Sequence, residues 1–281
     1  MARLRTVLVR TNDHYPLQVN CYEPFARDRI PHVLIINSGA GIPQTFYGPF
    51  SAWLADHGFY VFTYDYRGIG GSRGASVKGL QASIEDWGSK DCAAAISYAL
   101  ERCRGAKLYI LGHSIGSVVT GFVSHTPKIE RMLLVSPHTG YFGDYAEEGK
   151  WKMFTMWHIF MPLLSHAFGY FPGRRFGLPE DLPYSVAIEW GRRRWRRNLR
   201  NDEKVGGFAR IVTRALALRP PDDPFATRSA YDRIRSKFSS ADFLERELPT
   251  NGSVGHFDFF RRHHRDSLWA IALRWLALGE I

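Results

Sequence analysis

YILGHSIGSVV, residues 109–119, is the stretch that decides the fold of this chain. A short apolar run ends at Gly112, and an apolar segment of helical character follows Gly116 directly. The pattern Gly-x-Ser-x-Gly between a strand and a helix places its serine on a tight, exposed turn. The glycines leave room for the two backbones, and N–H groups at the helix start can face a developing oxyanion. Ser114 is therefore the predicted nucleophile, and the alternative is a packing turn that holds a serine by chance.

A serine hydroxyl needs a base, and the base needs a group that orients it. His256 follows the last predicted strand and precedes the last helix, so its loop lies at the edge of the sheet where Ser114 is exposed. Asp222 and Asp223 follow an earlier strand and precede a helix. Only one of two adjacent carboxylates can point at the histidine, and either could instead be a helix-start residue. His256 is the predicted base.

Short apolar runs alternate with segments of helical spacing along most of the chain. The runs lie at Val33–Asn37, Tyr60–Tyr64, Leu108–Leu111 and Met132–Val135, with helical spacing at Phe46–His57, Ile84–Leu100 and Ile115–Thr126. Before them, Leu4–Arg10 and Leu17–Tyr22 alternate in polarity and predict an antiparallel hairpin at a sheet edge. The alternation predicts an α/β fold with right-handed crossovers and a mostly parallel central sheet, covered by helices on both faces.

This rhythm stops between about His138 and Gly207, where aromatic residues, prolines and arginines accumulate. It resumes at Ile211–Leu218, with a helix predicted at Ser229–Lys237, a strand near Phe243–Leu248 and a terminal helix from about Ser267. We therefore predict a core domain of residues 1–137 and 208–281 with an inserted helical cap, or lid, of residues 138–207. An aromatic cap over a nucleophile favours a hydrophobic substrate, although the same aromatics could serve only to pack the cap.

Five motifs together resemble the α/β-hydrolase superfamily. They are NSGAG at 37–41, YDYRGIGGS at 64–72, GHSIG at 112–116, RPPDD at 219–223 and GHF at 255–257. The resemblance covers nearly the whole chain outside the cap. Within the superfamily, the motifs are similar to a little-characterised bacterial group of predicted hydrolases related to serine esterases and lipases.

The resemblance implies an α/β-hydrolase fold and the chain order serine, acid, histidine. The family acid usually stands four residues before a small residue that opens the next helix, which favours Asp223 because Thr227 is in that position. The implied oxyanion donors are the backbone N–H groups of Ala40 and Ile115. One departure is Ser38-Gly39, where many members have His-Gly.

Together these features predict a lipase-like serine hydrolase that cleaves a small-molecule, hydrophobic carboxylic ester. Ser114, His256 and Asp223 form its catalytic triad, and no metal or other cofactor is predicted. Two alternatives remain open. An acyltransferase would use the same acyl-enzyme with another acceptor. A non-catalytic binding protein would keep the fold and use the basic cap for docking.

The 37 Lys and Arg residues exceed the 27 Asp and Glu residues, which gives a formal net charge of +10. Much of the excess lies between Arg174 and Arg214, but no nucleic-acid-binding motif accompanies it, so no nucleic-acid partner is expected. The run Arg192–Arg197 (RRRWRR) could contact an anionic lipid, a phosphate-bearing substrate or an acidic partner. The alternative is a solvated helix face.

The three cysteines have neither metal-ligand spacing nor a pattern typical of disulfide frameworks. The basic N-terminal segment is interrupted by polar residues and Pro16, unlike a signal peptide. No apolar run reaches the ~20 residues that a membrane span needs. A cytoplasmic location is therefore predicted.

Overall fold

The computed structural model describes residues 2–25, 30–123, 127–192, 206–249 and 252–281. Eight strands form one sheet in the order β1-β2-β4-β3-β5-β6-β9-β10. Their bounds are β1 Arg3–Arg10, β2 Pro16–Glu23, β3 His32–Asn37, β4 Phe59–Tyr64, β5 Lys107–His113, β6 Ile129–Val135, β9 Arg214–Arg219 and β10 Asp242–Glu247. In this sheet order, the neighbouring strands β4, β3, β5, β6, β9 and β10 pair in parallel. At one edge, β1 and β2 form the predicted antiparallel hairpin. This architecture confirms the predicted α/β fold.

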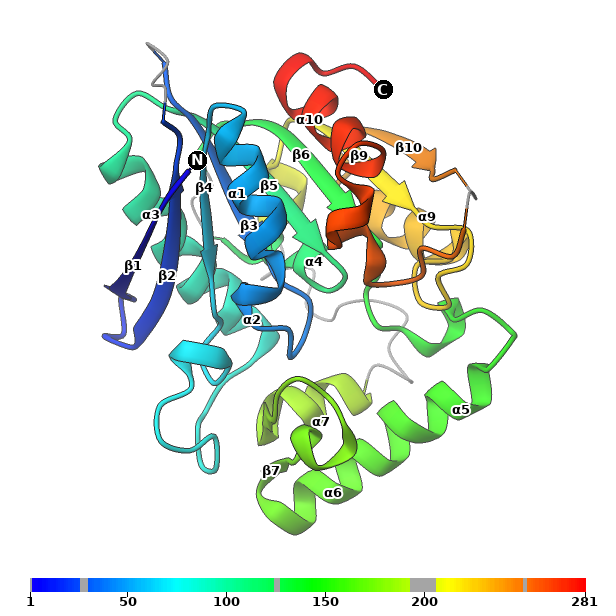
Figure 1. Ribbon diagram of the computed structural model, residues 1–281. Helices are drawn as coiled ribbons and strands as arrows, with labels where there is room; N and C mark the ends of the chain where they lie inside the picture. Colours follow the sequence, from blue (N-terminus) through cyan, green and yellow to red (C-terminus); the bar gives the residue numbers. More distant parts are fainter. Residues whose placement is uncertain (1, 26–29, 124–126, 193–205, 250–251) are drawn as a thin grey trace.

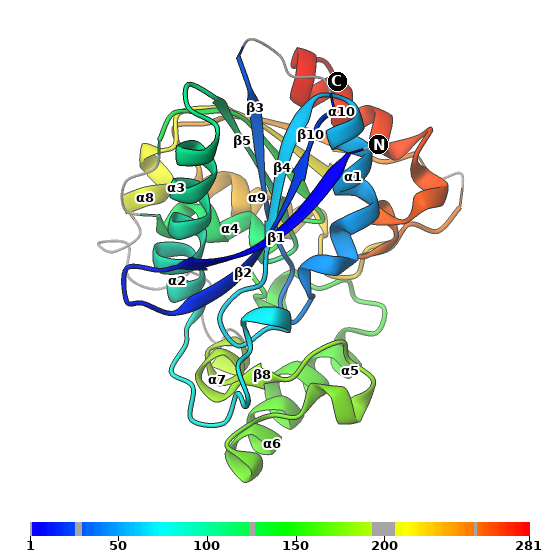
Figure 2. The same cartoon turned by 60° about the vertical axis from the view of Figure 1, so that its left-hand side comes forward.

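Helices cover both faces of the sheet (Figures 1 and 2). One face carries α1 (Gly48–Asp56) and α10 (Leu268–Leu278), and the other carries α3 (Ala93–Arg102), α4 (Gly116–Val119), α8 (Gly206–Arg210) and α9 (Arg228–Lys237). In β3 the buried side chains point alternately to the two faces of the sheet. Val33 and Ile35 lie on the face covered by α3, α4, α8 and α9, and Leu34 and Ile36 lie on the face covered by α1 and α10. A strand covered on both faces is apolar throughout, which explains the unbroken runs in the sequence.

Two predicted helices differ from regular α-helices. The segment Ile84–Arg102 begins with α2 (Ile84–Asp86), continues as a π-helix at Trp87–Cys92 and ends as α3. The helix predicted at Ile115–Thr126 is α-helical only over α4 and is 3-10 at Thr120–Phe122, and residues 124–126 lie outside the described residues. Gly121 lies within this 3-10 turn, and its missing side chain leaves room for the Phe208 ring.

The stretch from residue 136 to residue 192 lies beyond the carboxyl ends of the strands (Figures 1 and 2). It contains α5 (Lys150–Thr155), a π-helical turn at Met156–Phe160, α6 (Met161–Phe168), the short hairpin β7 (Tyr170–Phe171) and β8 (Leu182–Pro183), and α7 (Tyr184–Arg192). We call its described part the cap. The domain bounds 138–207 stay a prediction. Of the arginine cluster Arg192–Arg197, only Arg192 belongs to the described residues.

Polar contacts attach the cap to the core along two edges. On one edge Arg73 pairs with Asp181 at 2.9 Å, and the N–H of Ile84 donates to Glu189 at 3.0 Å. On the other edge the N–H of Ala146 donates to the Pro224 carbonyl at 2.9 Å. The Asp144 carboxylate there also pairs with Arg233 of α9. The cap is thus held from both sides.

Charged residues in the turn after β4 hold that turn in place. The Asp65 carboxylate accepts hydrogen bonds from the backbone of Gln44 and of Gly71. Arg67 is buried and pairs with Asp91 at 2.7 Å and with Asp13 at 2.8 Å. These contacts fix the turn and do not reach the site described below.

None of the helices that the structure describes is long and apolar enough to cross a bilayer. The three cysteines are buried as free thiols. The cytoplasmic location stays a prediction.

Candidate active site

Ser114 occupies a strained turn between β5 and α4. Its φ of 58° lies in the left-handed region, which a residue with a side chain seldom adopts. A Cβ on Gly116 would lie 2.2 Å from the Asn37 carbonyl oxygen, and one on Gly112 would lie 2.6 Å from the Ser117 Cα. Only glycine at both positions lets strand and helix approach closely enough to hold this turn.

Replacing Gly116 with alanine should lower the free energy of unfolding by roughly 3 kcal/mol, because the new methyl group overlaps backbone that cannot move aside. Gly74→Ala is the control: that glycine has a φ of +69° and nothing within 4 Å of its added Cβ. The control should lose only about 1–2 kcal/mol, from left-handed strain alone. Urea denaturation measures both variants. Equal losses would contradict the steric argument.

The structure places His256 and Asp223 beside Ser114. The Ser114 Oγ is 2.9 Å from the His256 Nε2, and the His256 Nδ1 is 2.7 Å from the Asp223 Oδ2. All three side chains are buried. Because a carboxylate can only accept, His256 carries its proton on Nδ1 and offers Nε2 as an acceptor for the serine hydroxyl.

The Asp223 carboxylate is held ionised beside His256. Burial alone raises its pKa, but the electrostatic interaction with His256, their mutual hydrogen bond and the N–H of Phe225 outweigh burial and bring the pKa below its usual value. Its Oδ1 accepts from the N–H groups of Phe225 at 2.9 Å and Ala226 at 3.1 Å. The helix-start residue of α9 is instead Thr227, whose hydroxyl accepts from Ala230.

Asp222 points away from His256 and binds the loop that carries it. Its Oδ1 accepts from the Gly255 N–H at 2.9 Å, and its Oδ2 accepts from the Ser253 hydroxyl at 2.5 Å. The two adjacent aspartates therefore make different contacts: Asp223 contacts the imidazole of His256, and Asp222 contacts the loop that carries His256.

A second buried histidine, His113, links the loops around Ser114. Its Nε2 is 2.9 Å from the His256 carbonyl oxygen, and its Nδ1 is 2.7 Å from the Tyr47 hydroxyl, which accepts from the Gly39 N–H at 2.9 Å. Burial and the neighbouring His256 lower the pKa of His113 to about 3. At neutral pH it is therefore an uncharged ring that donates through Nε2.

The predicted oxyanion donors lie where strands β3 and β5 end. Ala40 lines the cavity above Ser114, and Ile115 is the residue before α4. The neighbouring Gly39 N–H is already used by Tyr47. A Cβ on Gly39 would lie 3.4 Å from the Ser114 Cβ, so the loop passes close to Ser114. The roles of the Ala40 and Ile115 N–H groups stay a prediction.

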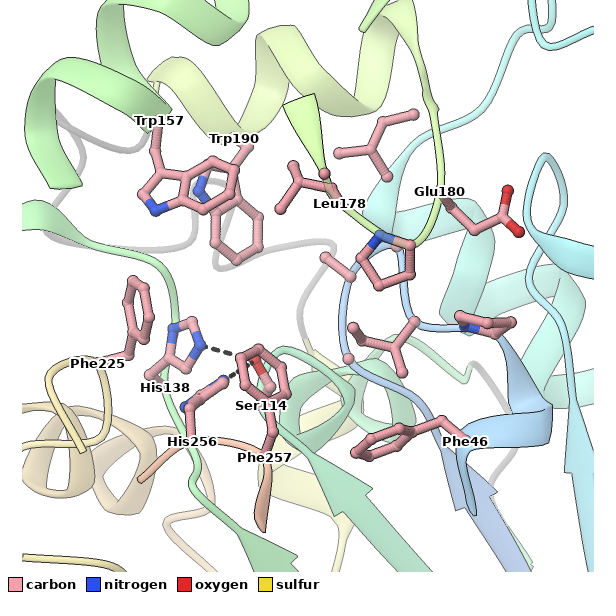
Figure 3. A pocket seen from close by; sticks show the side chains of 18 of the residues that line it. Phe46, Ser114, His138, Trp157, Leu178, Glu180, Trp190, Phe225, His256 and Phe257 are labelled. Atoms are coloured by element: carbon pink, nitrogen blue, oxygen red, sulfur yellow. Dashed lines mark hydrogen bonds between the residues drawn. The ribbon is translucent and has the colours of Figure 1, made fainter. Parts of the chain in front are cut away.

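His138 was not among the predicted site residues, yet it touches Ser114. Its Nε2 is 2.8 Å from the Ser114 Oγ (Figure 3), and its Nδ1 accepts from the Gly140 N–H at 2.9 Å. One feature of the sequence places His138 near Ser114. His138 follows the strand run Met132–Val135 as Ser114 follows its own run, and the carboxyl ends of neighbouring parallel strands meet at one edge.

A cavity of about 660 Å³ opens above Ser114 between the cap and the core. Its walls are mostly apolar: Trp157, Met161, Leu178 and Trp190 come from the cap, and Phe46, Phe225 and Phe257 come from the core (Figure 3). Glu180 is an acidic residue of the lining, and Arg261 is a basic one. The cavity therefore suits a largely apolar molecule that reaches Ser114 with one polar group.

Among the described residues, Asp258, His263 and His264 form a group with ligand atoms close enough to hold a cation. One oxygen of Asp258 lies 2.6 Å from the His263 Nε2 and 2.9 Å from the His264 Nε2. These contacts brace the loop after His256, and none of the three residues lines the cavity. The absence of a metal or cofactor stays a prediction.

A parallel sheet, a serine on a glycine-flanked turn after a central strand and a histidine on a late loop define an α/β-hydrolase. The family model described as "Serine aminopeptidase, S33" matches residues 29–173, slightly over half of the chain. The chain belongs to this family of the α/β-hydrolase superfamily.

Solved structures agree with the fold. The Pyrococcus furiosus esterase Pf2001 is similar with a TM-score of 0.61 and 15% identity, over 98% of this chain and 94% of that one. The esterase EaEST from Exiguobacterium antarcticum is similar with a TM-score of 0.63 and 14% identity, over 97% of this chain and 99% of that one. No curated protein matches the sequence significantly.

Proposed function

We propose that this α/β-hydrolase is a serine esterase that cleaves carboxylic esters with a hydrophobic acyl group. The observation that carries the proposal is the continuous chain of contacts from Asp223 through His256 to Ser114, at 2.7 and 2.9 Å, beneath a mostly apolar cavity. Nucleophile, base and orienting acid stand in hydrogen-bond reach of one another, as acyl transfer requires.

In the proposed reaction, the Ser114 Oγ attacks the ester carbonyl carbon while its proton passes to the His256 Nε2. The N–H groups of Ala40 and Ile115 stabilise the oxyanion of the tetrahedral intermediate. His256 then gives the proton to the departing alcohol oxygen, and an acyl-enzyme remains. Water repeats the sequence: it loses a proton to His256, attacks the acyl carbon and releases the acid, while His256 returns the proton to Oγ.

The environment of Glu180 favours an ester over a peptide with a free amino terminus. Such a peptide carries an ammonium group, which needs a carboxylate partner in the cavity. Glu180 lines the cavity, but one of its oxygens lies 2.7 Å from Arg174 and the other lies 3.8 Å from Arg73. The two guanidinium groups beside this carboxylate reduce its attraction for a further cation. The carboxylate is also turned away from Ser114 (Figure 3).

The first test is labelling with a fluorophosphonate probe, followed by peptide mapping. A single adduct on Ser114 is expected, because the probe reacts with serines that a base has activated. No adduct on folded protein would overturn the proposal and leave the binding-protein alternative ahead.

A series of p-nitrophenyl esters should then show kcat/KM rising by about fourfold per added CH₂ until the cavity is filled, since each buried CH₂ contributes about 0.8 kcal/mol. Aminoacyl p-nitroanilides are the matched comparison and should react far more slowly. A preference for the anilides would contradict the ester proposal. If added alcohols capture the acyl group faster than water does, the acyltransferase alternative is favoured.

A further inference from the structure

We propose that His138 is a second catalytic histidine, which donates a hydrogen bond to the Ser114 Oγ while charge develops on that oxygen. The proposal rests on the serine-hydrolase function proposed above and adds a residue to its reacting centre. Its starting point is that two imidazoles contact one hydroxyl: the His138 Nε2 at 2.8 Å and the His256 Nε2 at 2.9 Å.

A hydroxyl has one proton, so Ser114 can donate to only one of these rings and must accept from the other. The remaining contacts decide which. His256 uses its Nδ1 proton toward the Asp223 carboxylate, so its Nε2 is the acceptor. His138 receives the Gly140 N–H at its Nδ1, so its own proton is on Nε2. The hydrogen bonds therefore run from His138 to Ser114 and from Ser114 to His256.

The surroundings of His138 fix its ring in this orientation. The ring is 3% exposed, stacks on Phe225 with a 24° interplanar angle, and meets the edge of Trp190 in the cap. Phe225 also donates its N–H to Asp223, so one residue touches both the acid and the second histidine. A donor held this firmly needs no reorganisation when the reaction begins.

His138 keeps its proton through the cycle and acts by stabilising charge on Oγ. During attack, the Ser114 proton moves to His256 and negative charge gathers on Oγ, which strengthens the bond from His138. In the acyl-enzyme Oγ is an ester oxygen and a weak acceptor. When water displaces the acyl group, the C–Oγ bond breaks, charge returns to Oγ, and the bond from His138 strengthens again. Both acylation and deacylation should therefore benefit.

The test compares His138→Leu, which removes the donor, with His138→Gln, whose amide can donate from a similar position. His138→Leu should slow fluorophosphonate labelling, acylation and deacylation by roughly 10- to 10²-fold each, as the loss of a hydrogen bond to a charged oxygen typically does. His138→Gln should recover most of that loss. His158→Leu controls for lost packing, because His158 is another buried histidine of the cap but does not line the cavity.

Equal losses of rate in the leucine and glutamine variants would overturn the role of His138, as would rates of His138→Leu within about threefold of wild type. Neither result would affect the proposed esterase function, provided that the wild-type protein is labelled on Ser114. Absence of an adduct on wild type would instead overturn the esterase function and, with it, the role of His138. A readout apart from activity is the ¹⁵N spectrum. We expect a proton on the His138 Nε2, with a resonance that shifts in Ser114→Ala, and a proton on Nδ1 would contradict the donor assignment.

Discussion

Ser114→Ala and His256→Ala should each lower the rate of ester hydrolysis on the order of 10⁴- to 10⁶-fold, with circular dichroism and melting temperature close to wild type. Nucleophile and base act as a unit, so removing either leaves only the binding and oxyanion contributions. Because Ser114 has a φ of 58°, alanine there keeps the same backbone strain as serine and no new clash arises.

Ser117→Ala is the matched control for Ser114→Ala. Ser117 is buried one turn further along α4, and its hydroxyl donates to the Gly112 carbonyl at 3.3 Å without lining the cavity. Its loss should cost about 1 kcal/mol of stability and leave the rate within a few-fold of wild type. Substantial activity in Ser114→Ala would show that another residue is the nucleophile and would contradict the assigned triad.

Asp223→Asn should lower kcat by about 10⁴-fold, because an amide in this position can favour the wrong tautomer of the base and cannot stabilise the imidazolium. Asp222→Asn should lower it by less than about tenfold. The amide oxygen of the replacement can still accept from the Gly255 N–H, which is the contact that holds the loop. Steady-state kinetics with one ester measure both variants.

The contrast between neighbouring aspartates is the informative part of this experiment. Both substitutions remove one negative charge from the same turn, so a general electrostatic effect would act on both alike. A larger loss in Asp222→Asn would reverse the assignment of the acid. Equal, small losses would show that His256 needs no carboxylate partner.

The sequence predicted the parts of the site that depend on short-range pattern. Ser114 stands in a five-residue motif, and Gly112 and Gly116 are required there because backbone atoms would lie within 3 Å of an added Cβ. The central strands could be predicted because both of their faces are buried, which makes their sequences apolar throughout. His256 and Asp223 lie close to Ser114 because loops at the ends of parallel strands meet at one edge of the sheet.

The parts that the sequence did not reveal depend on side-chain direction across long separations. Whether His138 belongs to the site is decided by its rotamer between Phe225 and Trp190, and no local pattern encodes that. The same holds for His113, which joins Tyr47 to the His256 loop. The π-helical turn at Trp87–Cys92 was also not anticipated, because its apolar spacing is close to that of an ordinary α-helix.

The attachment of the cap along two edges bears on how substrates and products pass through the cavity. The ion pairs Arg73–Asp181 and Arg233–Asp144 hold the described cap to two different parts of the core. We expect a cap held in this way to stay closed during turnover, so that the width of the entrance limits the passage of substrates and products more than a gating motion does. For the slowest-leaving acids, turnover should then respond to solvent viscosity and to product bulk, and little to agents that trap a lid open.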